Sequence, residues 1–213
     1  MHPAASVGAL RRGELPAAQR VLARAFQDNP LNRAVIGSSA RRRLRANLHG
    51  MRAHLPQAER HGLLLSARAE DQLVGVLSST PPGAYPLPPP SVAVRLRCLL
   101  GQGLRVAHRW ARVYELLQDH HPVERHWYLG TLGVEPELWG RGVGTELLSV
   151  WLRMVDADAA PAYLETDAAG NIRFYRRAGF EVVEEIRALG VTIWTMRRPT
   201  VGGGGWAGQQ EGA

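Results

Sequence analysis

The segment Glu137-Leu-Trp-Gly-Arg-Gly-Val-Gly-Thr-Glu-Leu-Leu148 has glycine at every second position from 140 to 144. The residues just before it, 126–134, are apolar, aromatic and β-branched, which predicts a buried strand. An amphipathic segment follows the glycines to about Ala160 and predicts a helix. A glycine-rich turn between a strand and a helix N-terminus exposes several backbone N–H groups. The order of these features therefore predicts a phosphate-binding loop, to which Arg141 adds a positive charge.

Two better-known phosphate loops do not fit this segment. A Walker loop needs a Gly-Lys-Ser/Thr sequence, and the chain contains no lysine. The dinucleotide fingerprint G-x-G-x-x-G fails because Gly140, Gly142 and Gly144 are spaced by two. A plain glycine turn in front of a helix remains the alternative.

A second segment, about twenty residues further on, narrows the choice. Residues 162–166 read as another buried strand, and residues 171–180 as a short helix that ends at a glycine. The two segments together resemble the GNAT superfamily of acyl-CoA-dependent N-acyltransferases, over about 126–198. Trp139-Gly-Arg-Gly-Val-Gly144 is similar to the family's coenzyme A pyrophosphate loop, Gln/Arg-x-x-Gly-x-Gly/Ala. The chain departs from that pattern at Trp139, which removes one polar group near the pyrophosphate.

The resemblance implies the fold. It implies an α/β (α+β) GNAT fold, with a central, mixed, mostly antiparallel sheet of six to seven strands flanked by helices. It also implies one domain over 1–200, in which an acceptor-side half (about 1–125) precedes an acetyl-CoA-binding core (about 126–198). The glycine-rich tail, 201–213, is expected to be disordered.

The resemblance also implies where acetyl-CoA binds. The expected ligands of the pyrophosphate and pantetheine are residues of the strand end, the loop and the second helix. They are Leu132, Gly133, Val134, Gly140, Arg141, Gly142, Val143, Gly144, Thr145 and Asn171. Within the superfamily the chain is most similar to the puromycin N-acetyltransferase subfamily, through 127–134, the run from Leu164 to Phe180, 194–197 and 25–30.

Two residues are expected to carry the chemistry of direct acetyl transfer to an amine. Tyr175 occupies the position of the family's tyrosine, which gives a proton to the departing thiolate. The base that deprotonates the amine is harder to assign, because 126–134 contains no carboxylate. Glu165 is the first candidate, directly or through a water, and His126 and Glu124 are weaker ones. For both Tyr175 and Glu165, a purely structural role is the alternative to the catalytic one.

Composition limits the other classes of function. The net charge of +7 lies outside the proposed catalytic half: residues 1–125 have 18 arginines and 8 acidic residues, whereas 126–213 have 8 and 11. The cluster 41–45 is expected to be the solvated face of a helix. A single cysteine, Cys98, excludes an internal disulfide, and neither a metal site nor a nucleic-acid motif is recognised. With no apolar run of about 18 residues and no signal peptide, the protein is expected to be cytoplasmic, without nucleic-acid or membrane partners.

The first half of the chain contains several predicted elements. Residues 14–27 predict a helix stopped by Asp28-Asn-Pro30, and 39–55 a second helix. A hairpin is expected over 63–68 and 72–79, followed by an extended loop with six prolines, 81–90. Residues 92–117 predict a helix broken near 101–103. Asp28 is either a turn residue or, as the resemblance implies, part of a helix end that borders the acceptor cleft, where it could attract the acceptor amine.

The leading hypothesis is an acetyl-CoA-dependent N-acetyltransferase that acts on a primary amine of a small molecule, for example an antibiotic such as puromycin or a metabolite. Acetyl-CoA is then a substrate, no metal is required, and the protein is a monomer or a homodimer. The alternatives are acetylation of a protein N-terminus or lysine, and a non-catalytic acyl-CoA-binding sensor.

Overall fold

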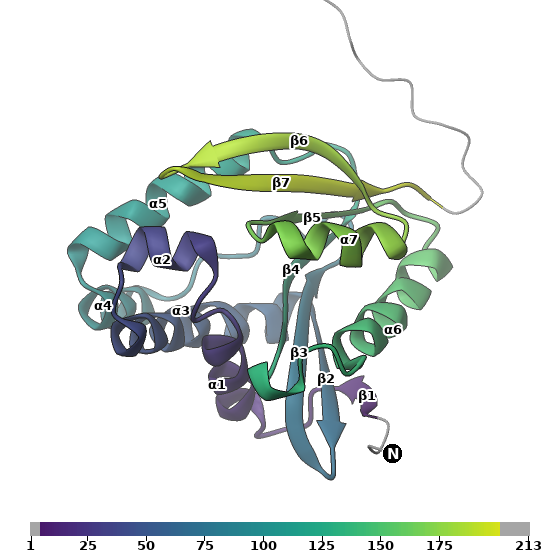
Figure 1. Cartoon of the computed structure of the whole chain (residues 1–213), viewed down its shortest axis with the longest axis horizontal. Helices are drawn as coiled ribbons and strands as arrows, with labels where there is room; N and C mark the ends of the chain where they lie inside the picture. The colour runs from purple at the N-terminus through teal and green to yellow at the C-terminus, as the bar shows by residue number, and fades with distance from the viewer. Residues whose placement is uncertain (1–4, 201–213) are drawn as a thin grey trace, which may run out of the picture.

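Seven strands form one sheet in the computed structural model, which describes residues 5–200 (Figure 1). Their order is β1-β2-β3-β4-β5-β7-β6, and all neighbours are antiparallel except β4 and β5. This confirms the predicted mixed, mostly antiparallel sheet. The strands are β1 (Ser6–Ala9), β2 (Leu63–Ala69), β3 (Gln72–Thr80), β4 (Trp127–Val134), β5 (Ala162–Thr166), β6 (Glu181–Ala188) and β7 (Val191–Arg198).

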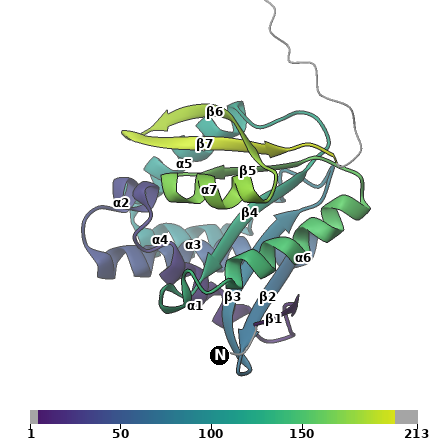
Figure 2. The same ribbon diagram turned by 45° about the vertical axis from the view of Figure 1, so that its right-hand side comes forward.

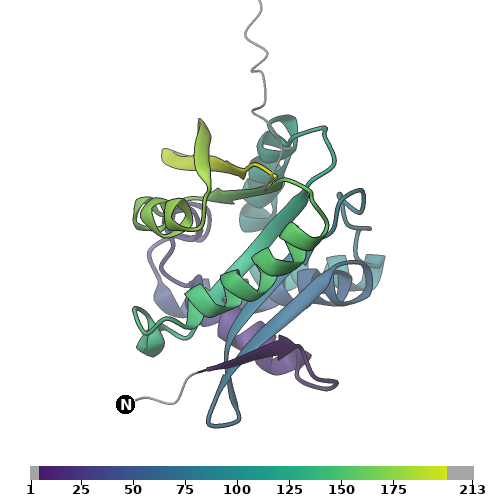
Figure 3. The same cartoon turned by 90° about the vertical axis from the view of Figure 1, so that its right-hand side faces the viewer.

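Helices cover both faces of this sheet. On one face, α6 (Val143–Ala157) lies along β2, β3 and β4, as Figure 3 shows, and α7 (Ala169–Arg177) lies beside β5 and β6. On the other face, α1 (Leu15–Ala25) and α3 (Ala40–His61) cover the centre of the sheet, while α2 (Pro30–Ile36) and α5 (Leu104–Asp119) pack under β6 and β7. The remaining helix, α4 (Val92–Gln102), lies against α3, and the short 3-10 helix η1 (Pro136–Leu138) follows β4.

Most predicted elements are found, and the differences have local causes. The break at 101–103 is confirmed, because Gly103 has a φ of 88° between α4 and α5. Pro30 does more than end α1. It occupies the first turn of α2, where its missing N–H is not needed, so it starts a helix that the sequence analysis did not predict. Helix α3 continues through Pro56 to His61, and the four-residue edge strand β1 was also not predicted.

The arginine cluster 41–45 is not uniformly solvated, contrary to expectation. The side chain of Arg43 is 3% exposed and forms an ion pair with Asp28. Its guanidinium donates to the carbonyl oxygens of Gln27 (2.7 Å), Gly37 (2.9 Å) and Ser38. Arg43 thereby ties the start of α3 to the segment between α1 and α2.

One extra residue in β4 determines how this strand presents its side chains. Ser79 pairs with Leu129 and Ser78 with Thr131, so Gly130 forms a β-bulge. Before the bulge Leu129 packs in the core under α6. After it Val134 does so, while a side chain at Gly133 would meet Leu22 of α1 at 2.7 Å. The bulge therefore reverses which residues face α6 and which face α1.

Strand β5 accompanies β4 over only part of its length. The two strands pair from Trp127 with Ala162 to Leu129 with Leu164, and then diverge, as Figure 2 shows. Beyond this point, among residues 5–200, the edge of β4 that faces β5 has no strand partner. Its backbone N–H and C=O groups are available to an extended ligand.

Two expectations concern other properties of the chain. The tail 201–213, expected to be disordered, lies outside the described residues. Within residues 5–200, none of the helices has both the length and the apolar character needed to span a bilayer.

Candidate active site

A cavity of about 670 Å³ opens where β4 leaves β5. The end of β4, the glycine loop, the start of α6, α7 and the end of α1 form its walls. Ten of the predicted site residues line it together: Leu132, Gly133, Val134, Gly140, Gly142, Val143, Gly144, Thr145, Asn171 and Tyr175. Arg141 lies in the same loop but not in the wall, and Glu165 lies elsewhere.

The glycine loop directs the N-terminus of α6 toward this cavity. Gly140 and Gly142 have φ values of 75° and 86°, a left-handed conformation that other residues adopt at a cost of about 1–2 kcal/mol. Gly142 caps α6, whose first N–H groups have no acceptor in a preceding turn. A Cβ at Gly144 would be 3.6 Å or more from any protein atom, so glycine is not needed there for packing. Its benefit is close access of a ligand to the helix N-terminus.

Trp139, which replaces the family's usual polar residue, has a structural role in the loop. Its indole Nε1 donates to the carbonyl oxygen of Val134 at 2.9 Å, while 57% of the residue is exposed. The bond fastens the loop to the end of β4. It also occupies one of the backbone acceptors on the strand.

Asn171 lies at the first turn of α7 and lines the cavity. Its Nδ2 donates to Thr166 Oγ1 at 3.2 Å, and Thr166 is the last residue of β5. The amide therefore joins α7 to the strand. Its carbonyl oxygen and the second hydrogen of Nδ2 remain for a ligand.

Tyr175 projects from α7 into the core beside the cavity. It is 7% exposed, and its ring contacts Phe174 and Phe180, with centroids 5.0 and 5.9 Å away. Burial raises the pKa of the phenol well above its usual value. The hydroxyl therefore keeps its proton at neutral pH, as a proton donor must.

Glu165 lies on the other face of β5, where it is the first residue after the last pair with β4. Its neighbour Leu164 belongs to the core with α6 and α7, so the alternation of the strand turns Glu165 away from Tyr175. The carboxylate is 8% exposed, and Tyr128 donates to its Oε2 at 2.8 Å. The proposed acid and base thus lie on opposite faces of β5, near the point where β4 and β5 separate.

The end of α1 and the residues after it also line the cavity, as the functional interpretation of this helix end predicted. Ala25, Phe26, Asn29 and Pro30 line it, and the carboxylate of Asp167 holds their segment in place by accepting from Leu31 N at 2.7 Å. The sequence did not predict the contact with Asp167, which joins residues more than 130 positions apart.

Asp28, the other open candidate, pairs with Arg43 and lies 3.8 Å from Arg33. Asp28 also lines the cavity, and its side chain is 60% exposed. Its pairing with the arginines supports the turn, and its place in the cavity wall keeps the attraction of an amine as the alternative.

Comparison with known proteins shows the family of the chain. The model of the acetyltransferase (GNAT) family matches residues 38–180, about two thirds of the chain. The chain belongs to this family. The matched region begins well before 126, so it includes most of the acceptor-side half that sequence reasoning related only weakly to the family.

Solved acetyltransferases share the fold of this GNAT protein. A histone acetyltransferase HPA2 and related acetyltransferase from Corynebacterium glutamicum ATCC 13032 is 21% identical, with a TM-score of 0.72 over 92% of this chain and 97% of its own. The PaiA N-acetyltransferase from Thermoplasma acidophilum, solved with coenzyme A, is 14% identical, with a TM-score of 0.55 over 92% and 98%. The ribosomal-protein-S18-alanine N-acetyltransferase from Escherichia coli is 13% identical, with a TM-score of 0.54 over 98% and 99%.

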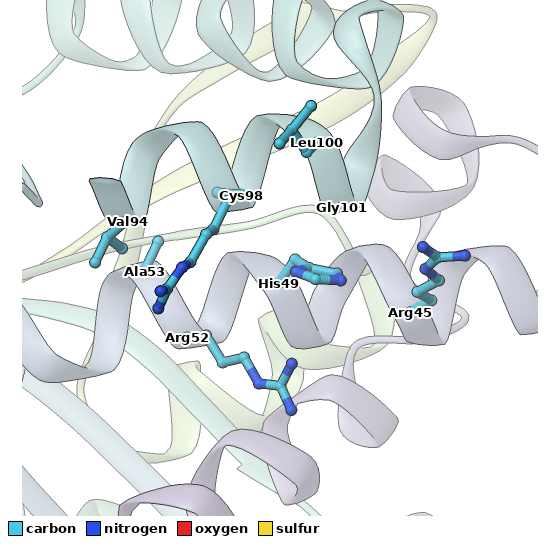
Figure 4. Close-up of a pocket in the computed structure, with 9 residues that line it drawn as sticks. Arg45, His49, Arg52, Ala53, Val94, Cys98, Leu100 and Gly101 are labelled. Atoms are coloured by element: carbon cyan, nitrogen blue, oxygen red, sulfur yellow. The ribbon is translucent and has the colours of Figure 1, made fainter. Parts of the chain in front are cut away.

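A second hollow of about 550 Å³ lies between α3 and α4 of this acetyltransferase (Figure 4). Arg45, His49 and Arg52 of α3 line it together with Arg97 and Cys98 of α4. Cys98 is only partly buried, and Leu96 and Leu100 of the same helix are 53% and 74% exposed. The hollow shares no residue with the cavity at the glycine loop.

Within residues 5–200, the acidic, histidine and cysteine side chains form no group of three or more that suits a metal ion.

Proposed function

We propose that this GNAT acetyltransferase moves the acetyl group of acetyl-CoA to the primary amine of a small molecule by direct attack. The observation that carries the proposal is the convergence of ten predicted residues on one cavity at the divergence of β4 and β5. Acetyl-CoA is a substrate here, and its phosphates, pantetheine arm and thioester each have a complementary part of this site.

The glycine loop and α6 bind the pyrophosphate. Backbone N–H groups of 140–145, the helix dipole and Arg141 supply positive potential. The pantetheine arm runs beside Leu132 to Val134, where the unpaired edge of β4 can bond it like an added strand. A main-chain N–H of the same segment stabilises the oxyanion that forms on the acetyl carbon.

Tyr175 and Glu165 then handle the protons. The amine attacks the acetyl carbon, Glu165 accepts the proton that the nitrogen loses, and the C–S bond breaks. Tyr175 gives its phenolic proton to the departing thiolate, which yields the free thiol. The position of Glu165 beside the last β4–β5 pair supports this role, because the thioester lies along β4.

A small acceptor is favoured by the segment that covers the base. Tyr85, from the proline-rich loop 81–90, stacks on His121 with centroids 3.8 Å apart and meets Tyr128 edge-on at 5.0 Å. This loop closes over the face of the sheet on which Glu165 lies, and a covered site suits a small amine better than a protein segment. Puromycin and its relatives are acceptors to test, on the resemblance of 127–134 and 194–197.

Thermal unfolding with acetyl-CoA and a panel of amines tests the proposal. Acetyl-CoA at a hundred times its Kd should add about 2.7 kcal/mol to the free energy of unfolding, or roughly 5–10 °C. Release of free thiol with one amine identifies the acceptor class. Because the chain has no lysine, acetylation of its own ε-amines cannot confuse the assay.

Two glycine variants make the test specific to the loop. Gly144→Val would place methyl groups at the cavity and should abolish the shift by acetyl-CoA. Gly170→Val, on α7 with no atom within 4 Å of its Cβ, should keep it. A shift that survives Gly144→Val would contradict the proposed binding site. Suppose that acetyl-CoA raises the melting temperature but no amine, protein N-terminus or lysine peptide causes release of free thiol. This result would instead favour a non-catalytic acyl-CoA-binding sensor.

A further inference from the structure

A buried row of side chains leads from Glu165 away from the cavity. His121 Nδ1 lies 3.7 Å from Glu165 Oε1, and the two side chains are only 6% and 8% exposed. On its other side, His121 Nε2 lies 3.0 Å from His126 Nε2. His126 Nδ1 in turn lies 2.7 Å from the backbone carbonyl oxygen of Glu124. The row connects the proposed base with the surface at 123–125.

The contacts determine where the hydrogen atoms are. A carbonyl oxygen only accepts, so His126 Nδ1 must carry a hydrogen and donate to Glu124. Burial is the main reason that the pKa of His126 lies below its usual value, which keeps this ring neutral and leaves its Nε2 as an acceptor. His121 Nε2 must then donate to His126. A neutral His121 therefore turns a bare lone pair at Nδ1 toward Glu165.

His121 Nδ1 is one of two buried side-chain polar atoms without a hydrogen-bond partner in residues 5–200. A buried polar atom left without a hydrogen-bond partner destabilises the folded state. The lone pairs of an imidazole and a carboxylate, facing one another, are stabilised by one proton between them. The pair is thus built to take up a single proton.

We propose that His121 is a positioning residue for the base, which receives at Nδ1 the proton that Glu165 removes from the acceptor amine. The inference rests on the proposed function. The N–H bond of the attacking amine breaks and an O–H bond forms on Glu165 Oε1. That O–H bond then breaks as Nδ1–H forms, which leaves a carboxylate beside an imidazolium. One proton is held per acetyl group transferred, and it returns to solvent when the product leaves.

The surroundings of His121 leave this proton few other places to go. Three phenols face its ring, those of Tyr85, Tyr128 and Tyr163, with centroids 3.8–5.1 Å away. Burial is the chief cause that raises the pKa of each phenol, so all three stay neutral near pH 7. Among the described groups that contact His121, only His126 and Glu165 can then change charge.

Nitrogen-15 NMR of the histidine rings tests the proton site without any acceptor. We expect the Nε2–H tautomer for neutral His121, and proton uptake at Nδ1 as the pH falls. Glu165→Gln removes the negative partner and should move this titration about one pH unit lower. Glu184→Gln is the matched control: it should affect His120, which is 2.9 Å from Glu184, and leave His121 unchanged. A neutral His121 with its hydrogen on Nδ1, or a titration indifferent to Glu165→Gln, would overturn the proposal.

The pH dependence of kcat, measured with the amine identified by thiol release, tests the same pair in turnover. His121→Asn should lower kcat at least tenfold and leave the KM for acetyl-CoA unchanged. The acid limb of the kcat–pH profile of this variant should move to lower pH, because a lone carboxyl group ordinarily titrates about two units below imidazole. The control variant His120→Asn should change neither kcat nor the position of the acid limb. An unmoved acid limb in His121→Asn would show a merely structural role, even if kcat fell.

The two measurements separate the inference from the function on which it rests. If no amine is acetylated by the wild type, the proposed function fails, and the NMR titration still decides whether the pair holds a proton. Retention of the acetyl-CoA thermal shift in each variant shows that the variant is folded.

Discussion

At the scale of the single residue, Tyr175 and Glu165, the proposed acid and base, lie in contrasting environments. The tyrosine is surrounded by the aromatic core, and burial alone raises the pKa of its phenol. The glutamate is equally shielded but has polar neighbours, Tyr128 and His121. One environment keeps a proton in place and the other provides sites to which a proton can move.

Tyr175→Phe should lower kcat about 10- to 100-fold, because the thiolate then departs without a proton donor. The Kd for acetyl-CoA should change less than twofold, since the ring and its packing remain. Rapid-mixing or steady-state thiol release measures the first, and calorimetry the second. Tyr114→Phe, at a residue that is 60% exposed, is the matched control. Unaltered turnover in Tyr175→Phe would remove the tyrosine from the mechanism.

Glu165→Gln should lower the rate roughly a hundredfold, and most strongly at low pH, where the unprotonated amine is scarce. The amide keeps the shape of the side chain and can still accept from Tyr128, so the melting temperature should hardly change. Initial rates from pH 6 to 9 provide the comparison. An equal loss at every pH would indicate that Glu165 has a structural role.

At the scale of the element, two buried arginines connect helices to the rest of the fold. Arg43 joins the start of α3 to the α1–α2 segment, and Arg68 of β2 joins Glu14 at the start of α1. The first connection supports the end of α1 that lines the cavity, and the second holds the start of the same helix. Neither was apparent from the sequence, where the cluster 41–45 was expected to be solvated and no role was assigned to Arg68.

Arg43→Met should lower the free energy of unfolding by about 3 kcal/mol. The methionine retains much of the volume, but several backbone carbonyls and Asp28 lose their donor. Urea denaturation measures the change. Arg41→Met, at an exposed position of the same cluster, should stay within about 0.5 kcal/mol of the wild type. Equal effects of the two substitutions would refute a special role of Arg43.

Glu14→Gln should destabilise the fold by about 1–2 kcal/mol at pH 7. The bond from Arg68 is the main cause that lowers the pKa of Glu14 in the native state. A carboxyl with a lowered native pKa stabilises the fold above its unfolded pKa and loses that contribution as the pH falls through the native value. The difference between variant and wild type should therefore shrink below about pH 4.5. Urea titrations at pH 7 and 4 test this, with exposed Glu59→Gln as control.

At the scale of the whole molecule, net charge favours an anionic substrate. The chain has a net charge of +7, and the arginines of 1–125 account for the excess. The resulting positive field attracts the phosphates of acetyl-CoA over a long range, and dissolved salt screens this attraction.

The association constant for acetyl-CoA should fall severalfold between about 0.05 and 0.5 M NaCl. Arg141→Gln should weaken binding at low salt and reduce this dependence, because the guanidinium lies in the loop that would hold the pyrophosphate. Arg41→Gln, far along the chain on α3, should change the slope little. Calorimetry at several salt concentrations measures the acetyl-CoA association constant of the wild type and of both variants. A slope that is the same in Arg141→Gln and wild type would exclude this arginine from phosphate binding.

The sequence alone was sufficient to predict the elements and the candidate-site residues that lie close together along the chain. The glycine spacing, Tyr175 and Asn171 lie within about forty residues, and each belongs to an element whose periodicity is local. The tertiary structure was needed for contacts between distant segments. It buried Arg43, shifted β4 by a bulge at Gly130, and placed His121 against Glu165, 44 positions later in the chain. Local patterns encode helices, strands and turns, but such contacts arise only when these elements pack, because burial and strand register depend on the whole sheet.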